Sequence, residues 1–323
     1  MVLKILHAVG TAILPSEYYT HLVVAVVGIV TVYAFAQGRK TSRERDLHGR
    51  TILITAAFHF LHRRLTIWLT PHSFQGAFTP NGLTLLNSLA QRGAYIIALT
   101  SEPPDTGTPA TLVSLLRSAT SNENIYAEQC DLTSPASIRD FCNKYHKSEQ
   151  RLDAVIFAHE YTPIGNLFSH KSPELEKQRQ TASCATFLVV TLLLPLLLTA
   201  PVERDIRLIT LVNPFYAAAA RVFTVSPSSA SSASILLTEG RRALRTAIFM
   251  RHLQRVLDAL PSSSQVPPTD VNAQSIPVVS DKVQRSNIVS ISVSPGISRA
   301  DVVAPLLGAD SSRGGISWLG MIM

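Results

Sequence analysis

Cysteines and charged residues are both scarce in this chain. Of its 323 residues, 16% are charged, against about 25% in typical soluble domains, although the hydrophobic fraction of 46% is ordinary. This apolar content excludes a wholly disordered chain. Cys130, Cys142 and Cys184 are too few and too scattered for a disulfide framework or a zinc site. We therefore expect no bound metal, and a reducing compartment around the main domain.

Acidic residues are also in deficit, because 29 lysines and arginines stand against 22 aspartates and glutamates, which gives a net charge of +7. The basic residues are not interleaved with aromatic ones, as they are in nucleic-acid-binding surfaces. We expect no nucleic-acid partner and interpret the charge as that of a protein beside a membrane.

A long apolar run lies near the start of the chain. Residues 18–38 carry no formal charge, and Leu22–Ala36 is apolar apart from one threonine and one tyrosine. About 20 such residues suffice for a helix to cross a bilayer. We expect residues 1–38 to form a membrane anchor with its helix at about 20–37; a monotopic hairpin that includes residues 1–14 is the alternative. A cleaved signal peptide fits less well because the run begins so late.

Residues 39–50 form a basic segment directly after this run. The segment contains Arg39, Lys40, Arg43, Arg45 and Arg50 against Glu44 and Asp46. By the positive-inside rule, this flank predicts a cytosolic main domain and a single-pass or monotopic anchor. We expect membrane lipid as a partner and an endoplasmic reticulum or lipid droplet location.

Short β-rich runs then alternate with helical patterns. The runs expected to be strands are Thr51–Thr55, Tyr95–Thr100, Asn124–Cys130, Leu152–Ala158, Ile206–Val212 and Asn287–Val293. Helices are expected at Gly82–Arg92, Pro135–His146, Thr181–Leu198 and about Ile235–Leu260. This alternation predicts an α/β fold with a doubly wound, Rossmann-like parallel sheet. Ligands bind such sheets beyond the carboxyl ends of the strands.

The first unit of this pattern resembles the short-chain dehydrogenase/reductase family if residues 56–75 are omitted. The family's phosphate turn is Thr-Gly-x-x-x-Gly-x-Gly; Thr55, Gly76 and Gly82 match it, and Pro80 replaces the middle glycine. Glycines let the backbone approach a pyrophosphate at a helix N-terminus. The resemblance implies an SDR-type fold over residues 51–304 and binding of NAD or NADP.

Further matches follow in the family's order. Asp131 and Leu132 resemble the pair that contacts adenine, Ala158 survives from the motif after the fourth strand, and Pro295-Gly296 resembles the turn beside the nicotinamide. Glu102, after the second strand, is a candidate ribose ligand and slightly favours NAD.

The family's catalytic residues are not retained. None of the eight tyrosines is followed four positions later by lysine. The alignment places Leu237 and Arg241 at the tyrosine and lysine positions, Ala182 at the asparagine position and Asn213 at the serine position. Leucine cannot transfer a proton, so hydride transfer by the usual route is not expected.

Two polar groups outside these positions have alternative interpretations. His159-Glu160-Tyr161 is interpreted as structural or exposed rather than as an unrelated acid/base site. Arg241, Arg242, Arg245, Arg251 and Arg255 recur along one predicted helix, and we expect them to form a solvated or interface face.

These observations predict a membrane-anchored, SDR-like NAD(P)-binding protein whose catalysis is impaired or non-standard. One alternative is an NAD(P)-dependent lipid or sterol ketoreductase or dehydrogenase that uses substitute residues. Another is a non-enzymatic, membrane-tethered interaction scaffold. The resemblance also implies a homodimer through the helices at Thr181–Leu198 and Ile235–Leu260, and a lipid-like small-molecule ligand.

Two insertions and a short tail interrupt the pattern. Residues 56–75 separate the first strand from its turn; their coding length would be sixty nucleotides, so we hypothesise a retained intron, with an amphipathic membrane-docking segment as the alternative. Residues 261–285 are rich in serine and proline and are expected to be a flexible excursion. The tail at residues 305–323 is shorter than the family's substrate lid.

Overall fold

The computed structural model describes part of the chain and divides it into two compact units. The described residues are 19–36, 45–55, 80–105, 107–148, 150–161, 173–201, 204–221, 235–260 and 286–297. The first unit comprises Met1–Glu44 and the second Arg45–Met323. The predicted insertions at 56–75 and 261–285, the tail at 305–323 and Gly76 lie outside the described residues.

In the first unit, α2 (Tyr19–Ala36) is an 18-residue helix. Its sequence is almost entirely apolar, with no charged residue in its first or last turn. Five of its valines are between 49% and 70% exposed: Val23, Val24, Val26, Val27 and Val30. The helix predicted at about 20–37 is therefore present.

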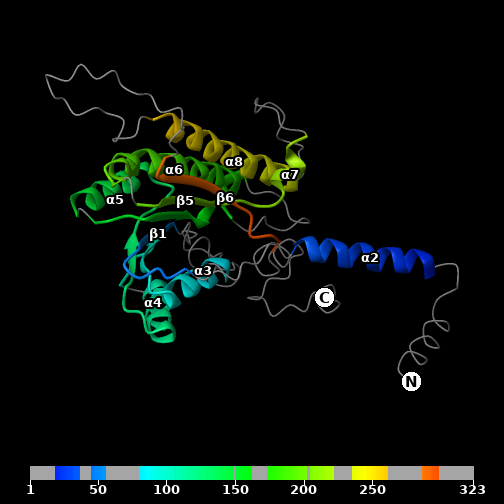
Figure 1. Cartoon of the computed structure of the whole chain (residues 1–323), viewed down its shortest axis with the longest axis horizontal. Helices are drawn as coiled ribbons and strands as arrows, with labels where there is room; N and C mark the ends of the chain where they lie inside the picture. Colours follow the sequence, from blue (N-terminus) through cyan, green and yellow to red (C-terminus); the bar gives the residue numbers. More distant parts are fainter. Residues whose placement is uncertain are drawn as a thin grey trace, which may run out of the picture. The chain divides into compact units, whose positions relative to one another are not determined.

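The second unit is built on a six-stranded sheet with the order β3-β2-β1-β4-β5-β6 (Figure 1). The strands are β1 (Thr51–Thr55), β2 (Tyr95–Thr100), β3 (Ile125–Gln129), β4 (Ala154–Phe157), β5 (Ile206–Leu211) and β6 (Ile288–Val293). All neighbouring strands are parallel. The order reverses between β1 and β4, so the predicted doubly wound sheet is confirmed, and its switch point lies between these two strands.

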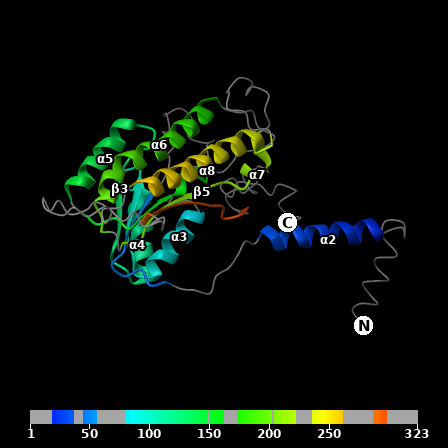
Figure 2. The ribbon, with the colours of Figure 1, turned by 45° about the horizontal axis from the view of Figure 1, so that its top comes forward.

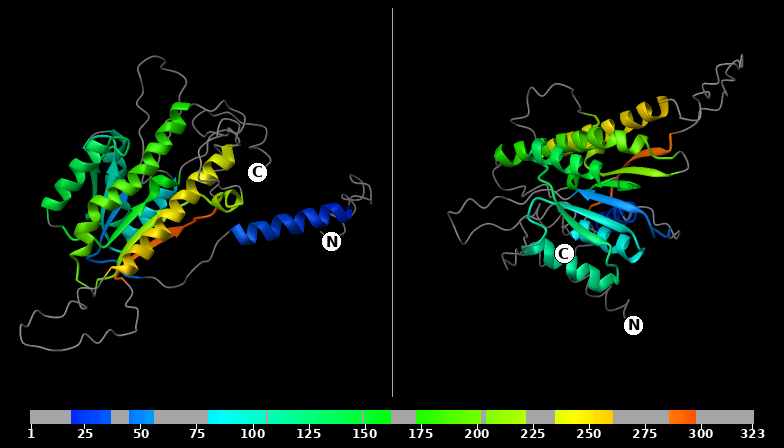
Figure 3. Two further views of the ribbon diagram at one scale, coloured as in Figure 1. Left: turned by 90° about the horizontal axis from the view of Figure 1, so that it is seen from above. Right: turned by 90° about the vertical axis from the view of Figure 1, so that its left-hand side faces the viewer.

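Helices cover both faces of this sheet. One face carries α3 (Pro80–Gln91) and α4 (Gly107–Thr120), and the other carries α5 (Pro135–Lys147), α6 (Pro173–Leu198) and α8 (Ile235–Ala259) (Figures 1 and 2). The right-hand view of Figure 3 shows the strands between these two layers. A one-turn helix, α7 (Tyr216–Ala219), and a 3-10 helix, η3 (Ala158–Glu160), follow β5 and β4.

Successive residues of a strand pack into two separate hydrophobic cores, one on each face of the sheet. Leu53 on β1 packs with α5, α6 and α8, whereas Ile52 and Ile54 pack with α3 and α4. All three are at most 4% exposed. Burial on both faces explains why the central strands are continuous runs of apolar, mostly β-branched residues, which made them easy to predict from the sequence.

One helix in the described part of the chain is long and apolar enough to cross a membrane, and it is Arg179–Leu198 of α6. Length and composition alone make it a candidate. Val189, Leu193 and Leu197 are buried in the core beside α5 and α8. The apolar character of α6 is therefore explained by packing inside the domain.

Some elements differ from the sequence expectation. The helix α4 was not predicted, α6 begins at Pro173 rather than Thr181, and β4 ends at Phe157, where η3 begins. Residues 45–50 of the expected linker belong to the second unit, since Leu47 N donates to Arg92 O at 3.1 Å.

The amino ends of β1 and β4 are joined by a buried carboxylate. Asp153 is 3% exposed and accepts hydrogen bonds from Arg151 Nε at 2.8 Å and Thr51 N at 3.0 Å. Burial alone would raise the pKa of Asp153. The hydrogen bonds from Arg151 and Thr51 and the charge of Arg50 outweigh burial, so the pKa lies below its usual value.

Candidate functional site

The carboxyl ends of the central strands define the region where a ligand of this fold would bind. Thr55 ends β1, Ala158–Glu160 follows β4, Asn213 follows β5 and Gly296 follows β6. Thr55 pairs with Phe157 across the switch point, so the ends of β1 and β4 are in register. The described residues at or just after the carboxyl ends of these four strands therefore lie along one edge of the sheet.

A saturated carboxylate lies at the end of β4. Glu160 is 2% exposed, and its carboxylate accepts hydrogen bonds from Thr186 Oγ1 at 2.6 Å and Arg242 Nη1 at 2.8 Å. Ser183 Oγ at 3.1 Å and Thr246 Oγ1 at 3.3 Å also donate to it. With these partners, the Glu160 carboxylate has little remaining capacity to accept a substrate proton.

Arg242 binds Glu160 to α8. Its Nη2 donates to the main-chain oxygen of Glu160 and to Glu239 Oε1, both at 2.6 Å. Arg179 on α6 lies 3.8 Å from Glu239, so two arginines and two glutamates balance in charge. We call Arg179, Glu239, Arg242 and Glu160 the buried ion cluster. The expectation that Arg242 lies on a solvated or interface face is wrong, because this residue is only 7% exposed.

His159 occupies the space between β1 and α6. It is fully buried; Nδ1 lies 2.6 Å from Thr55 Oγ1, and Nε2 lies 3.2 Å from Ala182 O and 3.0 Å from Thr186 Oγ1. Because a carbonyl only accepts, we assign the proton to Nε2 and let Thr55 donate to Nδ1. Burial lowers the pKa of His159, which keeps the ring neutral.

Tyr161 joins the loop after β4 to the loop after β6. Its hydroxyl donates to Gly296 O at 3.0 Å, and its ring packs against Leu211, Phe215 and Leu236. The side chain is 2% exposed. His159-Glu160-Tyr161 is therefore a buried, internally hydrogen-bonded segment, which agrees with the structural interpretation.

The four degenerate catalytic positions are brought to this region but supply no proton donor. Leu237 and Arg241 are half-buried on α8, and Ala182 is buried on α6, where its main-chain oxygen faces His159. Asn213 is fully buried after β5. None of the eight tyrosines in the sequence is followed four positions later by lysine, so the spacing that the family uses for its acid/base step is not present.

Among the described residues at this edge, two amide nitrogens have no hydrogen-bond partner. Asn81 Nδ2 in the first turn of α3 and Asn213 Nδ2 are both shielded from solvent and unpaired in the structure. Each buried, unpaired donor costs about 1–3 kcal/mol. Such groups call for a specific explanation, and a bound ligand is one.

The residues expected to bind the cofactor lie around the same edge, most of them buried. Asp131 uses its Oδ1 locally, accepting from Thr133 N at 2.8 Å and Thr133 Oγ1 at 2.7 Å. Gly296 has a φ of +88°, which favours glycine. The remaining positions are Thr55, Gly82, Leu132 and Ala158, all buried, and Pro295, which is exposed. Their roles stay predictions.

The sequence singled out Glu160 and Arg242 but gave no reason to join them, and Arg179, Glu239 and the hydroxyls around them were not anticipated. Only Glu239 and Arg242, spaced three residues apart on one helix, gave a local signal. Arg179, Ser183, Thr186 and Thr246 converge on the cluster through tertiary packing, which no sequence spacing reveals.

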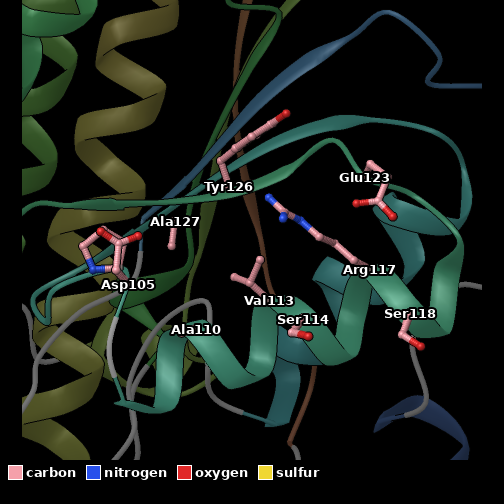
Figure 4. A pocket seen from close by; sticks show the side chains of 10 residues that line it. Asp105, Ala110, Val113, Ser114, Arg117, Ser118, Glu123, Tyr126 and Ala127 are labelled. Atoms are coloured by element: carbon pink, nitrogen blue, oxygen red, sulfur yellow. The ribbon is translucent and has the colours of Figure 1, made fainter.

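A separate hollow lies beside the edge strand β3. Figure 4 shows it between α4 and β3, with a volume of about 700 Å³. Arg117 closes one wall, with its guanidinium 5.2 Å from the ring centroid of Tyr126 and its Nη2 2.6 Å from Ile125 O. Asp105, Glu123, Ser114 and Ser118 also line this open hollow. Among the described residues no group of three or more metal-ligating side chains is found.

Comparison with known proteins finds relatives of this chain. No protein-family model matches the chain. An uncharacterised oxidoreductase of Saccharomyces cerevisiae is 30% identical over 220 residues, which are 63% of this chain and 49% of that protein. An uncharacterised oxidoreductase of Schizosaccharomyces pombe is 25% identical over 59% of this chain and 46% of its own length. The chain thus spans about half the length of the curated relatives it matches.

A solved structure from Pseudomonas syringae, described as a short chain dehydrogenase, superposes with a TM-score of 0.54 at 16% identity and covers 83% of each chain. The protein has the short-chain dehydrogenase/reductase fold. The SDR resemblance seen in the sequence is confirmed, together with the predicted SDR-type sheet. Within this SDR fold, the Glu160 and Arg242 pair lies at the end of β4, beside the switch point.

Proposed function

We propose that this protein is a membrane-anchored, NAD(P)-binding oxidoreductase homologue with impaired or non-standard catalysis. The fold and the two yeast oxidoreductases support the class of protein. The observation that carries the binding proposal is the switch point between β1 and β4, with the N-terminus of α3 beside it. A 12-residue helix directs the positive end of its dipole there, which favours a pyrophosphate.

The residues at this edge fit a dinucleotide. The amide nitrogens of Asn81 and Asn213 supply hydrogen-bond donors at two places along it, and neither has a partner in the part of the chain that the structure describes. Glu102 follows β2 and lies near the start of α4, since its Oε2 is 3.7 Å from the position that a Cβ on Gly107 would take. We assign the pyrophosphate to Asn81 and Gly82, and the adenosine to Glu102, Asp131 and Leu132.

A bound nicotinamide dinucleotide would supply or accept a hydride. The protein's own groups bind and orient, but those described at the edge do not exchange protons readily. The Tyr161 hydroxyl donates a hydrogen bond to Gly296 O. His159 is hydrogen-bonded to Thr55, and Glu160 to Thr186. This arrangement favours binding over rapid turnover.

Titration of the full chain in detergent with NADH and NADPH tests this proposal. We expect nicotinamide fluorescence to saturate with at least one of the two, and Glu102→Gln to shift the preference toward NADPH, because a carboxylate repels a 2′-phosphate. A parallel protein without residues 56–75 shows whether that segment weakens binding. A folded protein that binds neither dinucleotide, with or without residues 56–75, would contradict the proposal.

The membrane anchor is a second part of the proposal. The exposed valines of α2 present apolar surface that water disfavours, and residues 39–45 supply a basic flank. We propose that α2 anchors the protein in the endoplasmic reticulum or a lipid droplet, with the domain in the cytosol. Alkaline carbonate extraction should leave the full chain with membranes, and protease added to sealed microsomes should digest the domain. Release by carbonate would exclude an integral anchor.

Two alternatives share the same fold. The first is a membrane-tethered interaction scaffold. It is favoured by the buried ion cluster, because its glutamate and arginine side chains bind one another and are not left to act on a substrate. A lipid or sterol ketoreductase would need a substitute proton donor. Dinucleotide binding without oxidation of NADPH by a panel of lipid ketones would support the impaired enzyme, and turnover lost in Tyr161→Phe would support the ketoreductase.

Helices α6 and α8 also suggest a homodimer. Phe187 and Ile248 are 57% and 48% exposed, and the Phe187 ring meets the Phe249 ring edge-on at 5.6 Å. Large exposed apolar side chains on adjacent helices are typical of interfaces. We propose that a second copy covers them, and that Phe187→Glu yields a monomer in sedimentation analysis.

A further inference from the structure

The C-terminal half of α8 presents two arginines to solvent. Arg251 and Arg255 are one helical turn apart, so they lie on the same side of the helix, and both are exposed. Neither is paired within the part of the chain that the structure describes. Asp258, the next acid along α8, is half-buried and accepts a hydrogen bond from Gln254 Nε2 at 2.8 Å. The two arginines therefore carry positive charge that no described carboxylate balances.

Exposed apolar side chains lie beside these arginines. Val256 and Leu260 on α8 are both 42% exposed, and Leu198 at the end of α6 is 48% exposed. The two helices lie side by side (Figures 1 and 3), and the Phe187 and Phe249 rings meet at 5.6 Å. Leu198 follows Phe187 by eleven residues, as Leu260 follows Phe249. Leu198 and Leu260 therefore lie at the same end of the helix pair.

This end of the helix pair is the amino edge of the sheet, opposite to the edge where ligands of this fold bind. Ser290 N, near the start of β6, donates to Gln254 Oε1 at 2.6 Å. The chain also enters the domain at this edge, because Arg45 Nη1 lies 3.0 Å from Asp205 Oδ2, directly before β5. Residues 37–44 join the proposed anchor to Arg45, and eight residues span at most about 30 Å.

We propose that this surface docks the domain on an anionic lipid membrane. We call it the α8 end surface, and it consists of Arg251, Arg255, Val256, Leu260 and Leu198. The arginines bind headgroup phosphates through charge-assisted hydrogen bonds, and the apolar side chains enter the boundary between headgroups and acyl chains. The proposal rests on the proposed function, because the anchor brings the domain to the bilayer. A second copy was proposed on different side chains, those of Phe187 and Ile248.

The test uses the full chain in lipid nanodiscs with an environment-sensitive fluorophore at Val256→Cys. Cys184 is the exposed native cysteine and is replaced by serine. Burial raises the pKa of Cys130 to about 12 and that of Cys142 to about 11, so these thiols should not react with the label. The control label is at Leu115→Cys, which is 59% exposed on α4 across the sheet. The nanodiscs contain phosphatidylcholine alone or phosphatidylcholine with phosphatidylserine.

We expect the fluorescence at position 256 to brighten and shift to the blue with phosphatidylserine, and high salt to reverse this change. Arg251→Gln combined with Arg255→Gln should lower the ratio of docked to undocked protein by about 10- to 30-fold. Arg139→Gln combined with Lys147→Gln, two exposed cations on α5, is the matched control and should leave the ratio unchanged. The label at position 115 should not respond to the lipid.

Three results would overturn the proposal. The first is a label at position 256 that does not respond to phosphatidylserine, and the second is a response that persists when both arginines are replaced. The third is a signal that depends on the number of protein copies in each disc and not on the lipid, which would assign the surface to a second copy. If alkaline carbonate releases the full chain, the anchor fails by itself. The same labelled proteins mixed with phosphatidylserine vesicles then judge the α8 end surface separately.

Discussion

Replacing Arg242 by methionine should destabilise the domain strongly. Arg242 is 7% exposed and contacts two buried carboxylates, with Nη1 2.8 Å from Glu160 Oε2 and Nη2 2.6 Å from Glu239 Oε1. Arg242→Met leaves Glu160 with hydroxyl donors only and Glu239 with Arg179 at 3.8 Å. Removing one partner of a buried ion pair costs about 3–5 kcal/mol. At about 2 °C or more per kcal/mol, the thermal midpoint should fall by at least about 6 °C.

A double-mutant cycle separates charge from packing in this prediction. Glu160→Gln combined with Arg242→Met leaves Glu239 and Arg179 as a neutral pair, so the double variant should be more stable than the sum of the two single changes by about 1–3 kcal/mol. Arg245→Met, an exposed arginine on the same helix, is the control and should change stability by less than about 0.5 kcal/mol. Urea unfolding of the full chain, followed by circular dichroism, is measured for the wild type and the four variants. A loss below about 1 kcal/mol in Arg242→Met would refute the reasoning.

Other predictions concern the same region and the sheet. Gly240→Ala should cost about 1–3 kcal/mol in urea unfolding, because its Cβ would lie 2.6 Å from Phe215 O and 3.0 Å from Ala219 Cβ; an unchanged midpoint would show that α7 moves aside. The free energy of unfolding should fall as the pH drops below about 6.5, because the folded pKa of His159 is depressed and the unfolded chain binds more protons; His159→Gln should flatten this slope. Asp153→Asn should remove a further acid-dependent loss below about pH 4, since that pKa is also depressed in the folded state.

The sheet could be predicted from the sequence because its strands are buried on both faces. TILIT and YIIALT were placed correctly to the residue, since β-branched runs of this length fit only a central strand. The helix α4 was missed because Gly107, Pro109 and several serines and threonines resemble a loop. Its core contacts, Val113 and Leu116, are few.

The environment of the arginines on α8 could not be predicted, because adjacent helical residues point about 100° apart. Arg241 and Arg242 have the same chemistry, yet Arg242 alone is buried on the Glu160 carboxylate. The choice depends on the register of α8 against η3 and α6, which the sequence pattern does not contain. The same argument applies to Asn213, whose unpaired amide becomes evident only when its neighbours in space are known.

Polar groups at the carboxyl edge fall into two kinds, and the division bears on function. His159, Glu160 and Tyr161 are hydrogen-bonded to the protein itself, so a proton transfer from any of them would first break a buried hydrogen bond. Asn81 and Asn213 hold unpaired donors, but an amide cannot act as an acid or base near neutral pH. Donors of this kind can hold a ligand, and the proposed binding function rests on them. Measurable NADPH binding with no ketone reduction would follow from this arrangement, and reduction that persists in Tyr161→Phe would require a proton donor other than Tyr161.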